Sequence, residues 1–129
     1  MNVIKVDMGL SIKPAVETEV KILREEVFLK MARGDKDQFA EIACEFFEET
    51  REVVAGWKLA HAGGDTAKIA MELHRCRGGA SLFGFEYLQQ LIRRWESDLS
   101  DGRLQINESE ILGALRDAEA ALAGLLFSR

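Results

Sequence analysis

The chain has 129 residues, of which 47% are hydrophobic and 30% charged, and its formal net charge is -5. These values predict one globular domain over residues 1–129, large enough to bury a core without metal or disulfide. The acidic balance and the lack of Lys/Arg clusters argue against a nucleic-acid partner. No apolar run approaches the roughly 20 residues of a membrane span, and residues 1–13 lack a signal-peptide core. We therefore expect a cytoplasmic monomer that contacts no membrane.

The N-terminal third favours an extended tail followed by a helix. Apolar residues alternate from Val6 to Ile12, which permits a short extended segment or an ordered tail over residues 1–13. From Pro14 to Arg33 the apolar residues recur in steps of three and four, which predicts a helix. They are Val16, Val20, Leu23, Val27 and Met31.

Two helices follow, each with its own start signal. Asp35 and Gln38 form a capping-box pattern before a helix that ends at Gly63-Gly64. Its expected core residues are Phe39, Ile42, Ala43, Phe46, Val53, Trp57 and Ala60. Asp65 is a good N-cap for the next helix, over about residues 66–83. Its apolar stripe is Ile69, Leu73, Cys76, Ala80 and Phe83.

The last two helices complete the pattern. A helix over about 85–99 buries Leu88, Leu91, Ile92, Trp95 and Leu99, and Asp101-Gly102 turns the chain. Asn107 with Glu110 predicts a capping box for a final helix, whose stripe is Ile111, Leu115, Ala118, Leu122 and Leu125. Amphipathic helices joined by short turns predict an all-α fold, an up-and-down four-helix bundle with an additional N-terminal helix.

The most informative stretch is residues 74–84 (HRCRGGASLFG). On a helix, residues three and four apart share a face, so Arg77 and Gly78 lie beside His74. Imidazole is a good nucleophile near pH 7, and a guanidinium can hydrogen-bond phosphate oxygens. Glycine inside a helix costs about 1 kcal/mol relative to alanine, and access to the ring is the simplest reason for Gly78 and Gly79. We expect access and docking to use Ala70, Met71, Gly78, Ser81 and Phe85.

Other candidates favour structural interpretations. His61 near a helix end is expected to be surface or capping, and the glutamates from Glu41 to Glu52 a solvated face. Cys44 and Cys76 fit no metal-ligand or CxxC spacing and are expected to be small buried residues in a reducing compartment. Because residues 72, 74 and 76 point in different directions on one helix, we expect no metal site. A lone histidine would itself more often be structural.

The whole pattern favours a functional over a structural His74, because residues 74–84 resemble the signature of the histidine-containing phosphotransfer (HPt) family. The matching residues are His74, Arg77, Gly78, Gly79, Ala80, Phe83 and Gly84. The chain departs from the usual pattern with Arg77 in place of lysine and Cys76 in place of leucine. The similarity extends more loosely over about residues 30 to 127.

The resemblance implies a phosphorelay intermediate without autokinase activity. His74 would accept a phosphoryl group from the aspartyl phosphate of a receiver domain and pass it to another receiver, with Arg77 stabilising the phosphate. The partners would be receiver domains of response regulators and hybrid histidine kinases. The chain itself would need no cofactor, because magnesium belongs to the receiver. Two alternatives stay open: a module that sequesters receivers without phosphotransfer, and a bundle whose histidine is structural.

Overall fold

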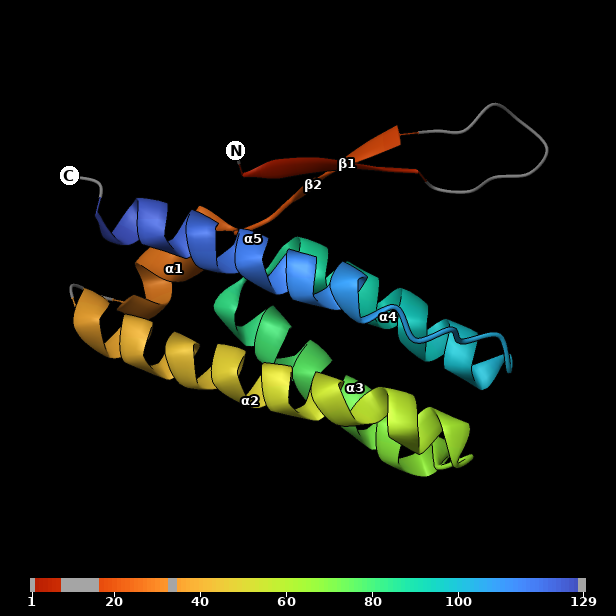
Figure 1. The fold of residues 1–129 in the computed structure, drawn as a ribbon. Coiled ribbons are helices and arrows are strands. Elements are labelled where there is room, and N and C mark those ends of the chain that lie inside the picture. The colour runs from red at the N-terminus through yellow and green to blue at the C-terminus, as the bar shows by residue number, and fades with distance from the viewer. Residues whose placement is uncertain (1, 8–16, 33–34, 128–129) are drawn as a thin grey trace.

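The structure is a computed structural model that describes residues 2–7, 17–32 and 35–127. A two-stranded hairpin precedes five helices in these ranges (Figure 1). The elements are β1 (Val3–Asp7), β2 (Glu17–Lys21), α1 (Glu25–Ala32), α2 (Lys36–Ala62), α3 (Thr66–Phe83), α4 (Glu86–Ser100) and α5 (Glu108–Leu126). Within these ranges, no helix combines the length and the apolar character needed to cross a membrane.

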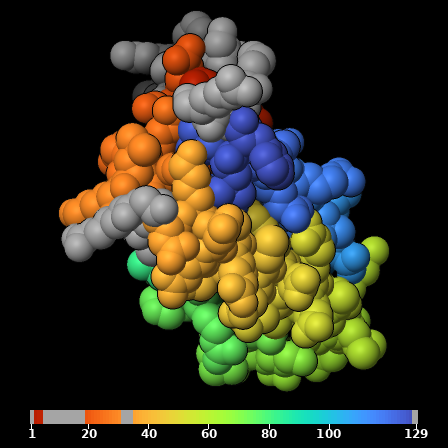
Figure 2. Space-filling view, turned by 90° about the vertical axis from the view of Figure 1, so that its left-hand side faces the viewer, coloured from red at the N-terminus to blue at the C-terminus, as the bar shows by residue number. Residues whose placement is uncertain are grey.

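The four long helices form a closed ring. α2 packs against α3, α3 against α4, α4 against α5, and α5 returns to α2. Figure 2 shows three of these helices from one side, with α2 between the blue α5 above and the green α3 below. The shared core is apolar, and its largest fully buried side chains include Trp57, Trp95, Phe47, Phe85, Ile69 and Leu73. The predicted all-α bundle is confirmed, with the short α1 packed against α2 and α3.

The N-terminal prediction is partly wrong. Residues 17–21 form strand β2 and pair antiparallel with β1, Ile4 lying opposite Val20, so the helix begins only at Glu25. Val20 and Ile22 are buried while Glu19 and Lys21 are exposed, which is the period of a strand. The hairpin lies along α5, where Ile4 and Ile22 line a hollow with Ala120. Pro14, Val16 and the alternation beyond Asp7 lie outside the described residues.

Two of the three expected helix caps are confirmed. The side chain of Asp35 accepts a hydrogen bond from the backbone N–H of Gln38, and that of Asp65 accepts one from Lys68. The capping box at Asn107 is wrong, because the Asn107 side chain makes no cap hydrogen bond. Glu110 instead accepts hydrogen bonds from the side chains of Arg94 and Trp95, tying α5 to α4.

The predicted core of α2 needs correction. Ile42 is 45% exposed, whereas Phe47, Thr50 and Val54 are buried. The buried stripe runs through Phe39, Ala43, Phe47, Thr50, Val54 and Trp57. Cys44 lies next to this stripe and is exposed, so the expectation of a buried thiol holds for Cys76 alone. An apolar residue on a long helix is therefore not always buried, because only the stripe that faces the neighbouring helices is covered.

A tight corner joins α3 to α4. Gly84 has φ +78°, and its conformation ends α3 by a hydrogen bond from the Phe85 N–H to the Ala80 carbonyl. A Cβ on Gly84 would lie 2.8 Å from Val27 Cβ, so glycine is needed here for both backbone geometry and close approach. The corner sets α3 and α4 side by side and antiparallel, which fixes the surroundings of His74.

Candidate functional site

His74 lies at the middle of α3 and points to solvent. Its side chain is 74% exposed. The Nη2 atom of Arg77, one turn further on, lies 3.1 Å from His74 Nδ1. Arginine has only donors, so Nδ1 must be the acceptor in this contact. The Nδ1 edge of the ring therefore faces a cation.

Glu96 on α4 completes the charged group. Its Oε1 atom accepts a hydrogen bond from Arg77 Nε at 2.5 Å, and its Oε2 atom lies 3.9 Å from His74 Nδ1. The Arg77 and Glu96 side chains are 28% and 25% exposed, so most of this ion pair is shielded from water. Such a pair holds the guanidinium more firmly than a fully exposed one would.

The predicted docking residues mostly share the exposed face of α3. Ala70, Met71, Gly78 and Ser81 are all exposed, Met71 to 57%. Phe85 is a correction, because it is fully buried. α3 ends at Phe83, and the left-handed turn at Gly84 directs the next side chain into the core, where it stacks on Phe47 and Phe83. Phe85 is therefore a core residue and offers no docking surface.

The two adjacent glycines of the motif have different surroundings. A Cβ on Gly78 would meet nothing within 4 Å, whereas a Cβ on Gly79 would overlap the ring of Phe46 on α2. Gly79 thus allows close packing of α3 on α2, and only Gly78 leaves open surface beside His74. The prediction that access explains both glycines is wrong for Gly79.

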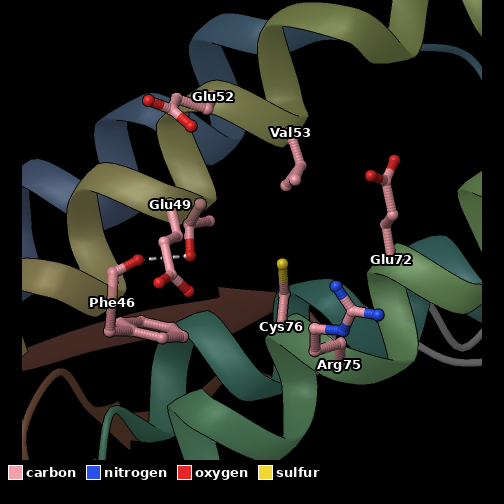
Figure 3. Close-up of a pocket in the computed structure, with 8 residues that line it drawn as sticks. Phe46, Glu49, Glu52, Val53, Glu72, Arg75 and Cys76 are labelled. Atoms are coloured by element: carbon pink, nitrogen blue, oxygen red, sulfur yellow. Dashed lines mark hydrogen bonds between the residues drawn. The ribbon is translucent and has the colours of Figure 1, made fainter.

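A groove between α2 and α3 is the other candidate (Figure 3). It is lined by Phe46, Glu49, Thr50, Glu52, Val53, Glu72, Arg75 and Cys76. Residues 72, 75 and 76 lie on the side of α3 away from His74, so the groove is separate from the exposed histidine. Burial raises the pKa of the Cys76 thiol to about 11, which keeps it protonated and a poor nucleophile near pH 7.

The other residues considered in the sequence lie on the exposed surface or in the core, away from the His74 site. His61 is exposed in the last turn of α2, and the glutamates at positions 41, 45, 48, 49 and 52 are exposed. Trp57 and Trp95 are core residues, and the indole N–H of Trp57 donates to Glu72. In the part of the chain that the structure describes, no three His, Cys, Asp or Glu side chains form a group that could hold a metal ion.

Sequence reasoning missed Glu96. It lies on a different helix and belongs to no local motif. A signal was nevertheless present, because His74 precedes Phe85 by eleven residues and Glu96 follows Phe85 by eleven. Two helices that run antiparallel from a tight corner place equidistant residues opposite each other. The Gly84 corner therefore predicts that Glu96 lies across from His74.

The fold and the site together define a class: a helical bundle that presents an exposed histidine beside a cation. The family model described as Hpt domain matches residues 41–124, and the chain belongs to this family. Hpt domains are phosphotransfer carriers of two-component phosphorelays rather than kinases, and they interact with receiver domains. β1, β2 and α1 lie outside the matched range. No match was found among curated proteins or solved structures.

Proposed function

We propose that this chain relays phosphate between receiver domains, with His74 as the phosphoacceptor. The observation that carries the proposal is the 74% exposure of the His74 side chain beside the Arg77 guanidinium. Because Arg77 lies against the Nδ1 edge of this exposed ring, the Nε2 edge is the one left for a partner to reach. The surrounding face, from Ala70 to Ser81, is small or apolar apart from Arg77, which suits close docking.

In the proposed reaction the Nε2 lone pair attacks the phosphorus of a receiver aspartyl phosphate. The N–P bond forms as the P–O bond breaks, and its electron pair leaves with the aspartate carboxylate. The Nδ1 atom carries the ring proton during this step. Transfer to a second receiver reverses these changes. The reaction needs mostly positioning and charge stabilisation, for which Arg77 supplies the cation and the receiver supplies magnesium.

The test uses the purified full chain and a receiver domain phosphorylated with labelled acetyl phosphate. We expect the label to move to the chain in an acid-labile, alkali-stable form. His74→Gln should abolish labelling, while His61→Gln should keep it, because His61 lacks a base three residues on and a glycine four residues on; Gly64 and Asp65 stand at those positions. Label retained by His74→Gln would remove His74 from its role.

The same mixture of the chain and the phosphorylated receiver also tests the alternative function, a module that binds receivers without phosphotransfer. A chain that binds the phosphorylated receiver but never takes up label would be a sequestering module instead. Binding is measured by calorimetry or by gel filtration of the mixture. Label on a second receiver, added after removal of the first, would establish the relay.

A further inference from the structure

The Arg77 guanidinium faces two groups at once. Its Nε atom donates to the Glu96 carboxylate at 2.5 Å, and its Nη2 atom donates to His74 Nδ1 at 3.1 Å. With Nδ1 as an acceptor, the ring proton lies on Nε2. The distal nitrogen then has no free lone pair. The arrangement is therefore a resting one, in which the reachable nitrogen of His74 is not a nucleophile.

Attack through Nε2 requires Arg77 to leave the ring. The proton on Nε2 must be lost to water while Nδ1 gains one, and Nδ1–H cannot face an arginine donor. A phosphoryl group on Nε2 also lies on the opposite edge of the ring from Nδ1, so Arg77 must move to reach its oxygens. Both changes require Arg77 to move, and such a movement is opposed by the hydrogen bond that Arg77 donates to Glu96.

We propose that Glu96 is a positioning residue that competes with the phosphoryl group for Arg77, and so sets how much phosphate His74 holds. This inference rests on the proposed function. When Arg77 is bound to Glu96 the unloaded histidine is stabilised, and when Arg77 turns to phosphate that ion pair is weakened. The carboxylate therefore favours release of phosphate to the next receiver over its storage.

The experiment measures how phosphate divides at equilibrium between one receiver and this chain. Glu96→Gln keeps a hydrogen-bond acceptor but removes the charge that holds Arg77. It should shift the division toward the phosphorylated chain by roughly three- to tenfold, the scale of a partly shielded ion pair. Asp98→Asn, which removes a carboxylate from the same helix, is the matched control and should leave the ratio unchanged. Thermal unfolding of each variant checks that the bundle is intact.

A double-mutant cycle separates competition from simple repulsion between a carboxylate and phosphate. In an Arg77→Ala background the Glu96→Gln shift should largely disappear. A shift of equal size with and without Arg77 would overturn the proposal, as would an unchanged ratio in Glu96→Gln. The same gel tests the proposed function separately. A wild-type chain that takes up no label would refute the proposed function. A labelled wild-type chain whose phosphate ratio is unchanged by Glu96→Gln would refute only the competition for Arg77.

A readout independent of phosphate is the imidazole tautomer, followed by ¹⁵N NMR of the histidine ring. The wild-type chain should show Nε2–H for His74 with Nδ1 accepting. Glu96→Gln should loosen this state toward a mixture of tautomers, and His61 serves as the internal control. A wild-type ring with its proton on Nδ1 would contradict the resting arrangement.

Discussion

The ring of Phe46 on α2 lies directly over Gly79 on α3, so that a Cβ on Gly79 would stand 2.7 Å from Phe46 Cδ1. Phe46 cannot move away freely, because its ring also packs against Phe47, Phe83 and Phe85. A Cβ on the neighbouring Gly78, which lies on a different side of α3, would meet nothing within 4 Å. Two adjacent glycines thus serve packing and access separately.

Gly79→Ala should therefore destabilise the bundle. Overpacking a tight contact costs about 1–3 kcal/mol, which outweighs the gain of about 1 kcal/mol from replacing a helical glycine. Gly78→Ala adds no such overlap and gains only the higher helix propensity of alanine, so it should stabilise the fold by up to about 1 kcal/mol. Urea unfolding of both variants measures the difference, and equal stabilities would contradict the assigned packing.

Gly78→Leu separates stability from function. The added side chain enters open space, so the bundle should fold with a melting temperature close to that of the wild type. It also covers the surface beside His74, and transfer from a phosphorylated receiver should fall sharply. Transfer at the wild-type rate in a folded Gly78→Leu protein would mean that the docking face does not include Gly78.

Arg77→Ala should slow phosphotransfer and shorten the life of the phosphohistidine. A hydrogen bond to a charged group contributes about 1.5–3 kcal/mol, so the rate loss can reach about a hundredfold. Stability should fall little, because the truncated side chain at position 77 leaves room for water to hydrate the Glu96 carboxylate, which is 25% exposed with Arg77 in place. Rapid-quench transfer assays check the rate. Arg77→Lys is the control, since it keeps the charge but not the planar fork, and it should recover part of the loss.

The predicted fold is largely correct where helices carry strong local signals. α2 and α3 begin at aspartates whose side chains bond the third residue on, and α3 buries all five residues of its predicted stripe. The N-terminal error has a physical cause. Val20 and Leu23 are buried in the hairpin and in the turn after it, and their spacing also fits a helix. Only pairing with β1, which is not local, decides between the two.

The site was predicted less completely than the fold. His74, Arg77 and Gly78 belong to one helix face, so their neighbourhood follows from spacing. Glu96 and the burial of Phe85 depend on how the chain turns at Gly84, which adds a second helix to the site. The different surroundings of Gly78 and Gly79 likewise depend on the position of Phe46. Tertiary packing decides each of these cases.

The stability of the chain should respond to alkaline pH through Cys76. Burial raises its pKa from 9.0 to about 11, so the folded state keeps a proton that the unfolded state loses. The contribution is fully present below pH 9 and is lost as pH rises toward 11. The free energy of unfolding should fall across this window less in Cys76→Ala than in the wild type. Parallel slopes for the two proteins would contradict the burial of the thiol.

The helix that carries His74 is anchored at both ends. Asp65 caps its first turn, and the Gly84 carbonyl at its far end accepts a hydrogen bond from the Arg24 N–H at 2.8 Å, which ties the corner to the segment before α1. Fraying from either terminus is thus suppressed, and the amide at position 74 should exchange its hydrogen only when a large part of the bundle opens. A partner meets backbone that is already ordered, so none of its binding energy is consumed in ordering that helix.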